Sequence, residues 1–141
     1  SCKEKFPDEN IIIVCADIED QIMTLQAKDR KDFMLGSGIK NTGLDNLIKT
    51  GYKTLGLSTF FTSGPEESRA WTIEKNSKAA DAAGVIHTDF KKKFIRAETV
   101  TAEDFIKYKS FNECKNAGKL RLEGKDYLVN DGDVMYFRVG S

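Results

Sequence analysis

Apolar residues follow two different patterns along the chain, and the change between them lies near Gly56. Before it, residues 11–16 form a β-branched apolar run, which is typical of a strand buried on both faces. Residues 18–25 carry apolar side chains at helical spacing, and Asp17 is expected to cap this helix. Residues 44–55 repeat apolar positions at three- and four-residue steps. The pattern predicts a strand and two helices before the change.

From residue 57 onward, short aromatic and β-branched runs alternate with turn residues, as in a small mixed sheet. Residues 60–62 and 70–73 flank a Gly-Pro turn and predict a hairpin. Ser77 is expected to cap the next helix, whose small apolar residues continue to Phe90. The pattern over residues 57–90 therefore predicts a hairpin followed by a helix that packs on the sheet.

The last part of the chain predicts more strands and short helices. A strand is expected over residues 94–100, and Thr101 and Asp104 resemble a capping box that opens a short helix. Gly118 is expected to end the helical segment. Three further strands are predicted over residues 120–122, 127–129 and 134–139.

The order of these elements predicts an α+β fold class. A hairpin followed by a helix packed across a mixed sheet is the β-grasp, or ubiquitin-like, arrangement. We therefore expect a β-grasp domain over residues 57–141, preceded by a strand-helix-helix segment over residues 1–56.

Composition narrows the classes of function. The 141 residues include 22 basic and 22 acidic side chains, so nucleic-acid affinity would need a local basic patch. No apolar stretch approaches the roughly 18 residues of a membrane span, and no secretion signal is recognisable, so we expect a cytoplasmic location. Cys2, Cys15 and Cys114 are far apart with one histidine in the chain, and we expect no metal site.

The sequence has no phosphate-binding loop. Such a loop needs GxxxxGK(S/T), because backbone amides and the lysine hold the phosphates while the hydroxyl reaches Mg²⁺. The two Gly-Lys pairs of this chain are followed by Leu120 and Asp126. We expect no catalysis and no bound cofactor in this chain itself.

Several long runs of residues carry a family resemblance. The runs are residues 60–73, 83–90, 94–98, 117–127 and 131–134. They resemble the YchF family of Obg-like P-loop nucleotide hydrolases, and this resemblance implies that residues 57–141 are a TGS domain. Residues 13–16, followed by Glu19, resemble the last nucleotide-contacting segment of the family's GTPase-like domain, which implies that residues 1–56 are the carboxyl-terminal remnant of an α/β G domain.

The resemblance implies that an intact parent protein hydrolyses ATP, or GTP, with Mg²⁺, and that Cys15 and Ala16 contact the base there. For this chain it implies a non-catalytic regulatory module that contacts the ribosome or RNA. The alternative is a protein-interaction domain that docks on its own G domain or self-associates. Residues 1–56 favour the alternative, because apolar surface around residues 11–14 would pair edge to edge between copies.

Two basic clusters are the candidate RNA-binding or ribosome-binding residues. The first consists of Lys91, Lys92, Lys93 and Arg96, and the second of Lys119, Arg121 and Lys125. If the clusters share one face, they would bind phosphates, and an exposed Phe61 or Tyr127 would add base stacking. The alternative is an ordinary solvated surface.

Three other features have a structural explanation that we prefer. His87 near Asp89 is suggestive of a general base or half a metal site, but a lone histidine on a helix is more often structural, and we expect a helix-capping hydrogen bond. Residues 130–133 resemble a calcium loop without its distal glutamate, so a hairpin turn is predicted. Trp71 is expected in the core or at a domain interface.

Overall fold

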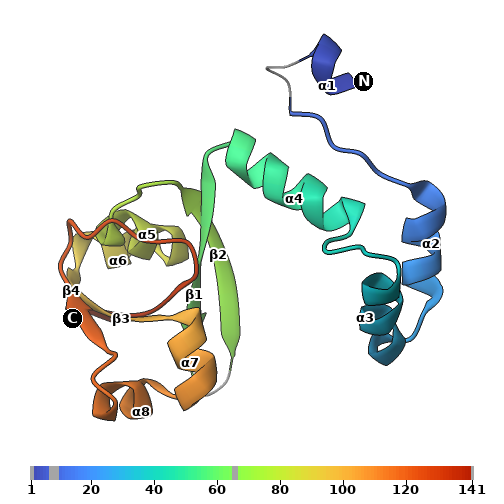
Figure 1. Ribbon diagram of the computed structural model, residues 1–141. Helices are drawn as coiled ribbons and strands as arrows, with labels where there is room; N and C mark the ends of the chain where they lie inside the picture. The colour runs from blue at the N-terminus through green and yellow to red at the C-terminus, as the bar shows by residue number, and fades with distance from the viewer. Residues whose placement is uncertain (1, 7–9, 65–66, 141) are drawn as a thin grey trace. The chain divides into compact units, whose positions relative to one another are not determined.

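The computed structural model describes residues 2–6, 10–64 and 67–140. The chain forms two compact units, Ser1–Leu55 and Gly56–Ser141, which we call the amino-terminal and carboxyl-terminal units. The amino-terminal unit contains the helices α1 (Cys2–Lys5), α2 (Ala16–Thr24), α3 (Ala27–Gly36) and α4 (Gly43–Thr54) (Figure 1).

The two helices predicted for the amino-terminal unit are present as α2 and α4. Thr42 begins α4 with a capping box, in which its side chain accepts from the Asp45 amide and the Asp45 carboxylate accepts from the Thr42 amide. The predicted cap of α2 is wrong, because Cys15 precedes that helix and no side chain bonds its first amides. The helix α3 was not predicted, because it buries no residue and so has no apolar periodicity.

The predicted strand over residues 11–16 is also wrong for this structure. Residues 10–15 have no regular secondary structure, and the helix α2 already begins at Ala16. A strand needs hydrogen-bonding neighbours, and the described part of the amino-terminal unit contains no other strand. Ile13 and Val14 are exposed instead.

One close backbone approach ties α2 to the start of α4. The Gly43 amide donates a hydrogen bond to the Glu19 carboxylate. A Cβ atom at residue 43 would lie 2.9 Å from Cγ1 of Val14, so any larger residue there would force the Val14 side chain to move.

The carboxyl-terminal unit contains five strands and four helices among its described residues. They are β1 (Leu57–Ser63), β2 (Ser68–Glu74), α5 (Ala79–Ile86), α6 (Thr88–Lys92), β3 (Phe94–Thr101), α7 (Ala102–Tyr108), α8 (Phe111–Asn116), β4 (Arg121–Glu123) and β5 (Asp133–Val139). This is a mixed α+β fold built on one sheet.

The strands lie in the order β2-β1-β5-β3-β4. The hairpin of β1 and β2 is antiparallel, with Phe60 opposite Trp71, and confirms the prediction. The central pair, β1 and β5, is parallel at Phe61 and Val134, whereas β3 is antiparallel to both β5 and β4. Of the predicted Gly-Pro turn, Pro65 and Glu66 lie outside the described residues.

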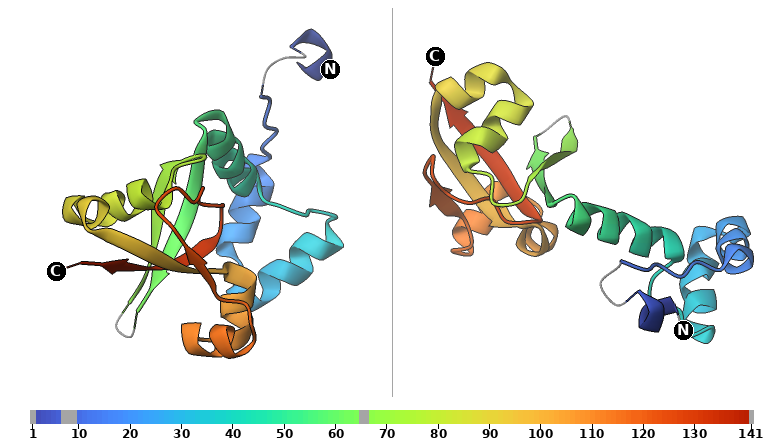
Figure 2. Two further views of the ribbon diagram at one scale, coloured as in Figure 1. Left: turned by 90° about the vertical axis from the view of Figure 1, so that its left-hand side faces the viewer. Right: turned by 90° about the horizontal axis from the view of Figure 1, so that it is seen from above.

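The two faces of the sheet pack against different helices, α5 on one face and α7 and α8 on the other (Figure 2). On one face, Ala79 and Ala82 of α5 meet Phe60 and Met135 in the larger core. On the other face, the smaller core contains Val100, Val134 and Cys114, with aromatic rings from α7 and α8 against it. Successive side chains of a strand point to opposite faces, so β5 contributes to both cores.

Of the predicted helix caps and helix ends in this unit, two are confirmed and two are wrong. Thr101 accepts from the Asp104 amide at 3.1 Å and caps α7, as expected. Gly118 adopts a positive φ of 68° just after α8 and ends it. The Ser77 cap is wrong by one residue, since Lys78 precedes α5 and the Ser77 hydroxyl donates to the Glu74 carbonyl. The predicted helix up to Phe90 is two helices, α5 and α6.

Two predictions near the carboxyl end are wrong. Residues 127–129 form a single bridge between Leu128 and Lys78, not a strand. The turn over residues 130–133 exists, but it does not join a hairpin, because β3 lies between β4 and β5. This turn buries Asp133, whereas Asp131 is exposed and its Oδ1 accepts from the Thr59 amide at 2.7 Å.

Candidate functional site

The first basic cluster lies at the end of α6, and a histidine cap positions it. Nδ1 of His87 accepts a hydrogen bond from the Asp89 amide at 3.2 Å, so the histidine begins α6. Its ring also lies 5.7 Å from that of Phe90. The prediction of a helix-capping role for His87 is confirmed.

The three lysines of this cluster have different surroundings. Nζ of Lys91 lies 2.6 Å from Oδ1 of Asp81, and its aliphatic stem covers Gly84, where an added Cβ would meet Cβ of Lys91 at 3.2 Å. Lys92 and Lys93 are exposed, and neither has an acidic partner among the described residues. Lys92 and Lys93 are therefore the two lysines of this cluster that have no acidic partner among the described residues.

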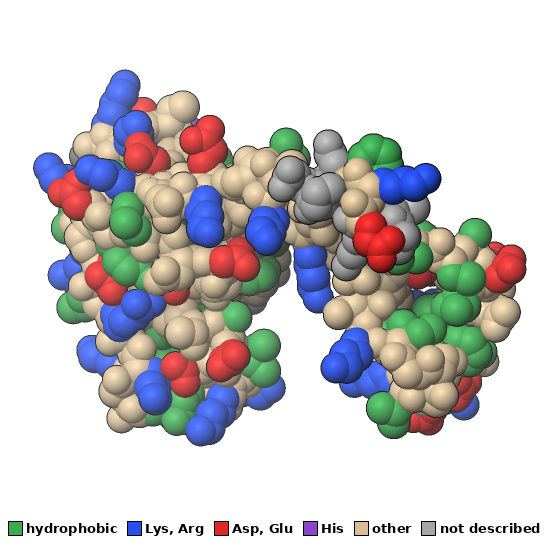
Figure 3. Space-filling model, turned by 45° about the horizontal axis from the view of Figure 1, so that its top comes forward, with side chains coloured by type: hydrophobic (Ala, Val, Ile, Leu, Met, Phe, Trp, Pro, Cys, Tyr) green, Lys and Arg blue, Asp and Glu red, His purple; other side chains and the backbone are tan. Residues whose placement is uncertain are grey.

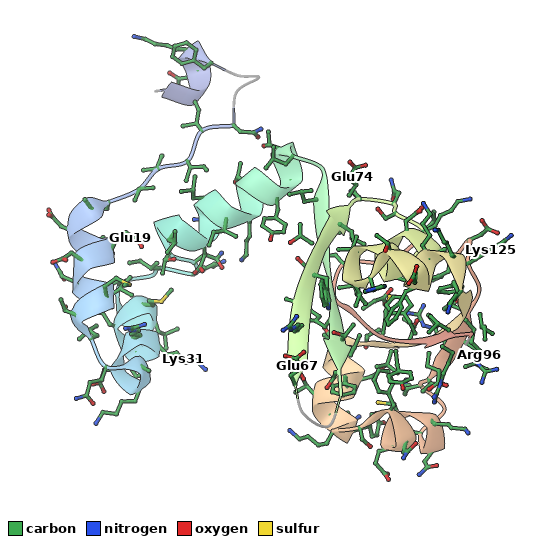
Figure 4. The ribbon with its side chains drawn as sticks, turned by 180° about the vertical axis from the view of Figure 1, so that it is seen from behind. Glu19, Lys31, Glu67, Glu74, Arg96 and Lys125 are labelled. Atoms are coloured by element: carbon green, nitrogen blue, oxygen red, sulfur yellow. The ribbon has the colours of Figure 1, made fainter. Side chains whose placement is uncertain are left out.

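Only two of the three basic residues in the second cluster are without an ion pair to a described residue. Lys119 and Lys125 are exposed and have no ion pair in the described part of the chain. Figure 4 shows Lys125 projecting outward from the carboxyl-terminal unit. Arg121 instead donates from Nη2 to Oδ1 of Asp133 at 3.0 Å, and its guanidinium lies 5.4 Å from the centre of the Tyr127 ring.

Asp133 is the centre of a buried polar network, with only 2 % of its surface exposed. Its Oδ2 accepts from the Tyr127 hydroxyl at 2.7 Å and from the Asn130 amide at 2.9 Å. Burial, and then the hydrogen bond to Asp133, raises the pKa of Tyr127. Burial works to lower the pKa of Arg121, but its contacts with Tyr127 and Asp133 raise it on balance. The network secures the chain between β4 and β5.

The two aromatic residues suggested for base stacking are not free rings. Tyr127 packs against the larger core and Phe61 against the smaller one. Both rings are partly buried, so neither is the freely exposed ring on which the expectation of base stacking depended. Trp71 packs against the larger core, as expected, and donates from Nε1 to the Thr62 hydroxyl at 2.9 Å.

Arg96 belongs to the opposite face of the sheet from Arg121. In β3, Arg96 is paired with Arg138 of β5, whereas Arg121 of β4 is paired with Thr99. Residues an odd number apart on one strand point to opposite faces. The basic residues are thus distributed around the unit, and Figure 3 shows Lys and Arg interspersed with Asp and Glu on its visible face.

The structure reveals a further set of residues on the face of Arg96 that sequence analysis missed. Nε of Arg138 donates to Oε1 of Glu98 at 3.0 Å, and the guanidinium carbon lies 4.5 Å from the centre of the Tyr136 ring. The hydrogen bond to Glu98 raises the pKa of Arg138. The alternation of Val134, Tyr136 and Arg138 along one strand was the available signal, since these residues share a face.

Cys15 and Ala16 lie at the amino end of α2. Cys15 is exposed in an extended conformation, and its carbonyl accepts from the Glu19 amide at 3.0 Å. Over the residues that the structure describes, no group of three or more His, Cys, Asp or Glu side chains is arranged to hold a metal ion. None of the described helices is long and apolar enough to cross a membrane.

The fold and these surfaces define a small mixed α+β domain with distributed basic side chains. Residues 57–140 match the family model YchF-GTPase_C, described as "Protein of unknown function (DUF933)". The chain therefore belongs to the YchF family.

Named relatives agree with this assignment. The chain is 52 % identical over 128 residues to the Ribosome-binding ATPase YchF of Haemophilus ducreyi, covering 91 % of this chain and 35 % of the relative. It is 44 % identical over 132 residues to Obg-like ATPase 1 of Pongo abelii, covering 94 % of this chain and 33 % of that protein. The chain thus spans about a third of the length of the curated relatives that it matches.

A solved structure is also similar. The YchF GTPase of Schizosaccharomyces pombe aligns with a TM-score of 0.78 at 35 % sequence identity, covering 96 % of this chain and 36 % of that one. The mixed sheet of the carboxyl-terminal unit is accordingly similar in fold to YchF.

Proposed function

We propose that this chain is a non-catalytic binding module, a TGS domain of the β-grasp type, through which a YchF-type ATPase contacts the ribosome. The strand order β2-β1-β5-β3-β4 supports the β-grasp assignment, as does α5 packed across the sheet. In this proposal residues 1–56 are the end of the GTPase-like domain and residues 57–141 are the TGS domain.

The observation that carries the proposal is the 52 % identity, across nine-tenths of the chain, to a protein named as a ribosome-binding ATPase. The sequence lacks the GxxxxGK(S/T) loop, so we assign hydrolysis of ATP or GTP, and the Mg²⁺ it uses, to the rest of an intact parent protein. Cys15 and Ala16 would contact the nucleotide base only in that intact parent protein. Contact with ribosomes also supports a cytoplasmic location.

The charges that carry ribosome binding in this proposal are those that the fold leaves free. Lys92, Lys93, Lys119 and Lys125 are exposed without ion pairs to described residues. Arg121 and Lys91 each have an acidic partner, and replacing Lys91 by glutamate would set a second negative charge beside Asp81. Such a change would disturb the packing of α5 and α6 as well as any binding.

We expect the double variant Lys92→Glu/Lys93→Glu to bind purified ribosomes at least about tenfold more weakly at low salt, because two phosphate contacts are lost and repulsion replaces them. Co-sedimentation of the chain with ribosomes at several salt concentrations measures the effect. The slope of log affinity against log salt should also fall by about one unit for each lost contact.

The matched control is Lys75→Glu/Lys115→Glu, which changes the net charge equally at two exposed lysines outside both candidate clusters. It should retain ribosome binding. Equal losses in the two double variants would show that only overall charge matters, and ribosome binding unchanged by Lys92→Glu/Lys93→Glu would remove that surface from the proposal.

The alternative function, self-association or docking within a parent protein, is favoured by one observation. The helix α4 exposes an apolar stripe formed by Leu44, Leu47, Ile48 and Tyr52, and Leu55 at its C-cap extends the stripe. An exposed apolar patch of this kind marks an interaction surface. The edge-to-edge pairing expected for residues 11–14 is not supported, because these residues form no strand.

If this stripe mediates self-association, sedimentation velocity should show a concentration-dependent rise in the mass of the full chain, since burial of leucine side chains drives association. The variant Leu44→Gln/Leu47→Gln should remain monomeric at the same concentrations. A monomeric full chain at high concentration would exclude self-association through α4.

A further inference from the structure

A groove lies on the sheet face opposite α5, where α7 and α8 leave part of the sheet uncovered. It has a volume of about 400 Å³. We call it the open-face groove and define it by six of its lining residues, which are Ser63, Glu98, Lys109, Phe111, Tyr136 and Arg138. None of them belongs to either basic cluster of the sequence analysis.

Basic side chains outnumber acidic ones among the described residues that line the groove. Arg96 and Arg138 lie directly opposite each other on β3 and β5, an arrangement of like charges that is unfavourable unless an anion lies nearby. Among the described residues that line the groove, Glu98 is the one acidic residue, and Arg138 reaches it only through Nε. Both Nη groups of Arg138 and the amine of Lys109 have no acceptor among the described residues.

An aromatic ring lies at the centre of this positive region. The Tyr136 side chain is 42 % exposed, although its strand neighbour Met135 is fully buried. Its ring centre lies 6.2 Å from that of Phe111, and the two rings are inclined by 66°. The guanidinium of Arg138 covers part of the Tyr136 ring. Packing by Phe111 and Arg138 holds the ring in place, so little conformational entropy is lost when a flat ligand stacks on it.

We infer that the open-face groove binds single-stranded RNA, with a base stacked at Tyr136 and neighbouring phosphates against Arg138, Lys109 and Arg96. An exposed aromatic ring within an excess of positive charge is the combination that single-stranded nucleic acid requires. An acidic peptide would match the charges but would leave the ring without a flat partner. The inference names the partner chemistry of the proposed ribosome contact, and it rests on that proposed function.

The test uses the full chain and a fluorescein-labelled oligoadenylate, with affinity measured by fluorescence anisotropy at low salt. Tyr136→Ala is expected to weaken binding by roughly tenfold, and Tyr136→Phe, which keeps the ring, by less than about twofold. A duplex RNA of equal length should bind more weakly than the single strand, because its bases are already stacked on each other.

Charge is tested separately with a matched pair. Lys109→Gln and Lys75→Gln each remove one exposed positive charge, but only Lys109 lines the groove, whereas Lys75 follows the far end of the hairpin. Lys109→Gln should weaken RNA binding and reduce its salt dependence, and Lys75→Gln should change neither. Circular dichroism of each variant confirms that the sheet is folded.

The outcomes separate this inference from the proposed function. Unchanged RNA affinity in a folded Tyr136→Ala variant overturns the inference. A chain that sediments with ribosomes but binds no oligoadenylate also overturns it and points to a ribosomal protein as the partner, with the proposed function intact. A chain that binds neither ribosomes nor RNA refutes both.

Discussion

Replacing Phe60 with alanine is expected to lower the free energy of unfolding of the carboxyl-terminal unit by about 4 kcal/mol. Phe60 is completely buried in the larger core, and its ring packs edge-on against Phe137 with 5.9 Å between the ring centres. Removing the ring leaves a cavity between α5 and the sheet that the close-packed alanines of α5 cannot fill. Urea unfolding followed by tryptophan fluorescence measures the loss, because Trp71 packs against the same core.

Two comparisons show whether the loss comes from the cavity. Phe60→Leu should recover more than half of the lost stability, because it leaves a smaller cavity. Tyr136→Ala removes a side chain that is 42 % exposed in the open-face groove and should cost less than about 1 kcal/mol. If Phe60→Ala proved no more destabilising than Tyr136→Ala, the assignment of the larger core would be wrong.

Replacing Asp133 with alanine is expected to cost about 3 kcal/mol, the second largest effect. The change leaves the Tyr127 hydroxyl, the Asn130 amide and the guanidinium of Arg121 without their shared acceptor. The expected loss of stability is smaller than for breaking a fully buried ion pair, because the Arg121 side chain is 41 % exposed and water replaces part of its interaction. Thermal unfolding monitored by circular dichroism measures the change.

The neighbouring Asp131 provides the matched control. It is exposed and accepts one hydrogen bond, from the Thr59 amide. Asp131→Ala should cost only about 1 kcal/mol, as expected for one hydrogen bond. Equal losses in the two variants would contradict the central role of Asp133.

The Asp133 network also affects which basic residues are available to bind a partner. Arg121 looks like part of a basic cluster in the sequence, yet its side chain pairs with Glu123 of β4 and with Asp133 at the start of β5. A substitution there would weaken the fold and any ribosome binding together. Binding experiments are therefore better directed at Lys92 and Lys93, and at the residues of the open-face groove.

Much of the local structure could be predicted from the sequence. The helix α4 with its capping residues Thr42 and Asp45, the hairpin of β1 and β2, and the cap at Thr101 all depend on residues close together in the chain. The family membership was also recognisable, because long ordered runs of residues match it. These signals are short-range and do not depend on how the sheet is assembled.

The long-range arrangement was not predictable from the same patterns. Residues 11–16 have the composition of a buried strand, yet without a neighbouring strand they form none. Similarly, α3 has no apolar side to detect because it buries no residue. A strand acquires its hydrogen bonds only from other strands, so its propensity alone does not determine its conformation.

The sequence by itself determined most element types of the carboxyl-terminal unit, its family and the absence of a GxxxxGK(S/T) motif. Only the tertiary structure decided that β5 lies between β1 and β3, which places Met135 in the core and Tyr136 and Arg138 on the open face. It also separated Arg96 from Arg121 onto opposite faces of the sheet. The reason is physical: periodicity shows that neighbouring residues face opposite ways, but only packing against distant segments determines which face is buried.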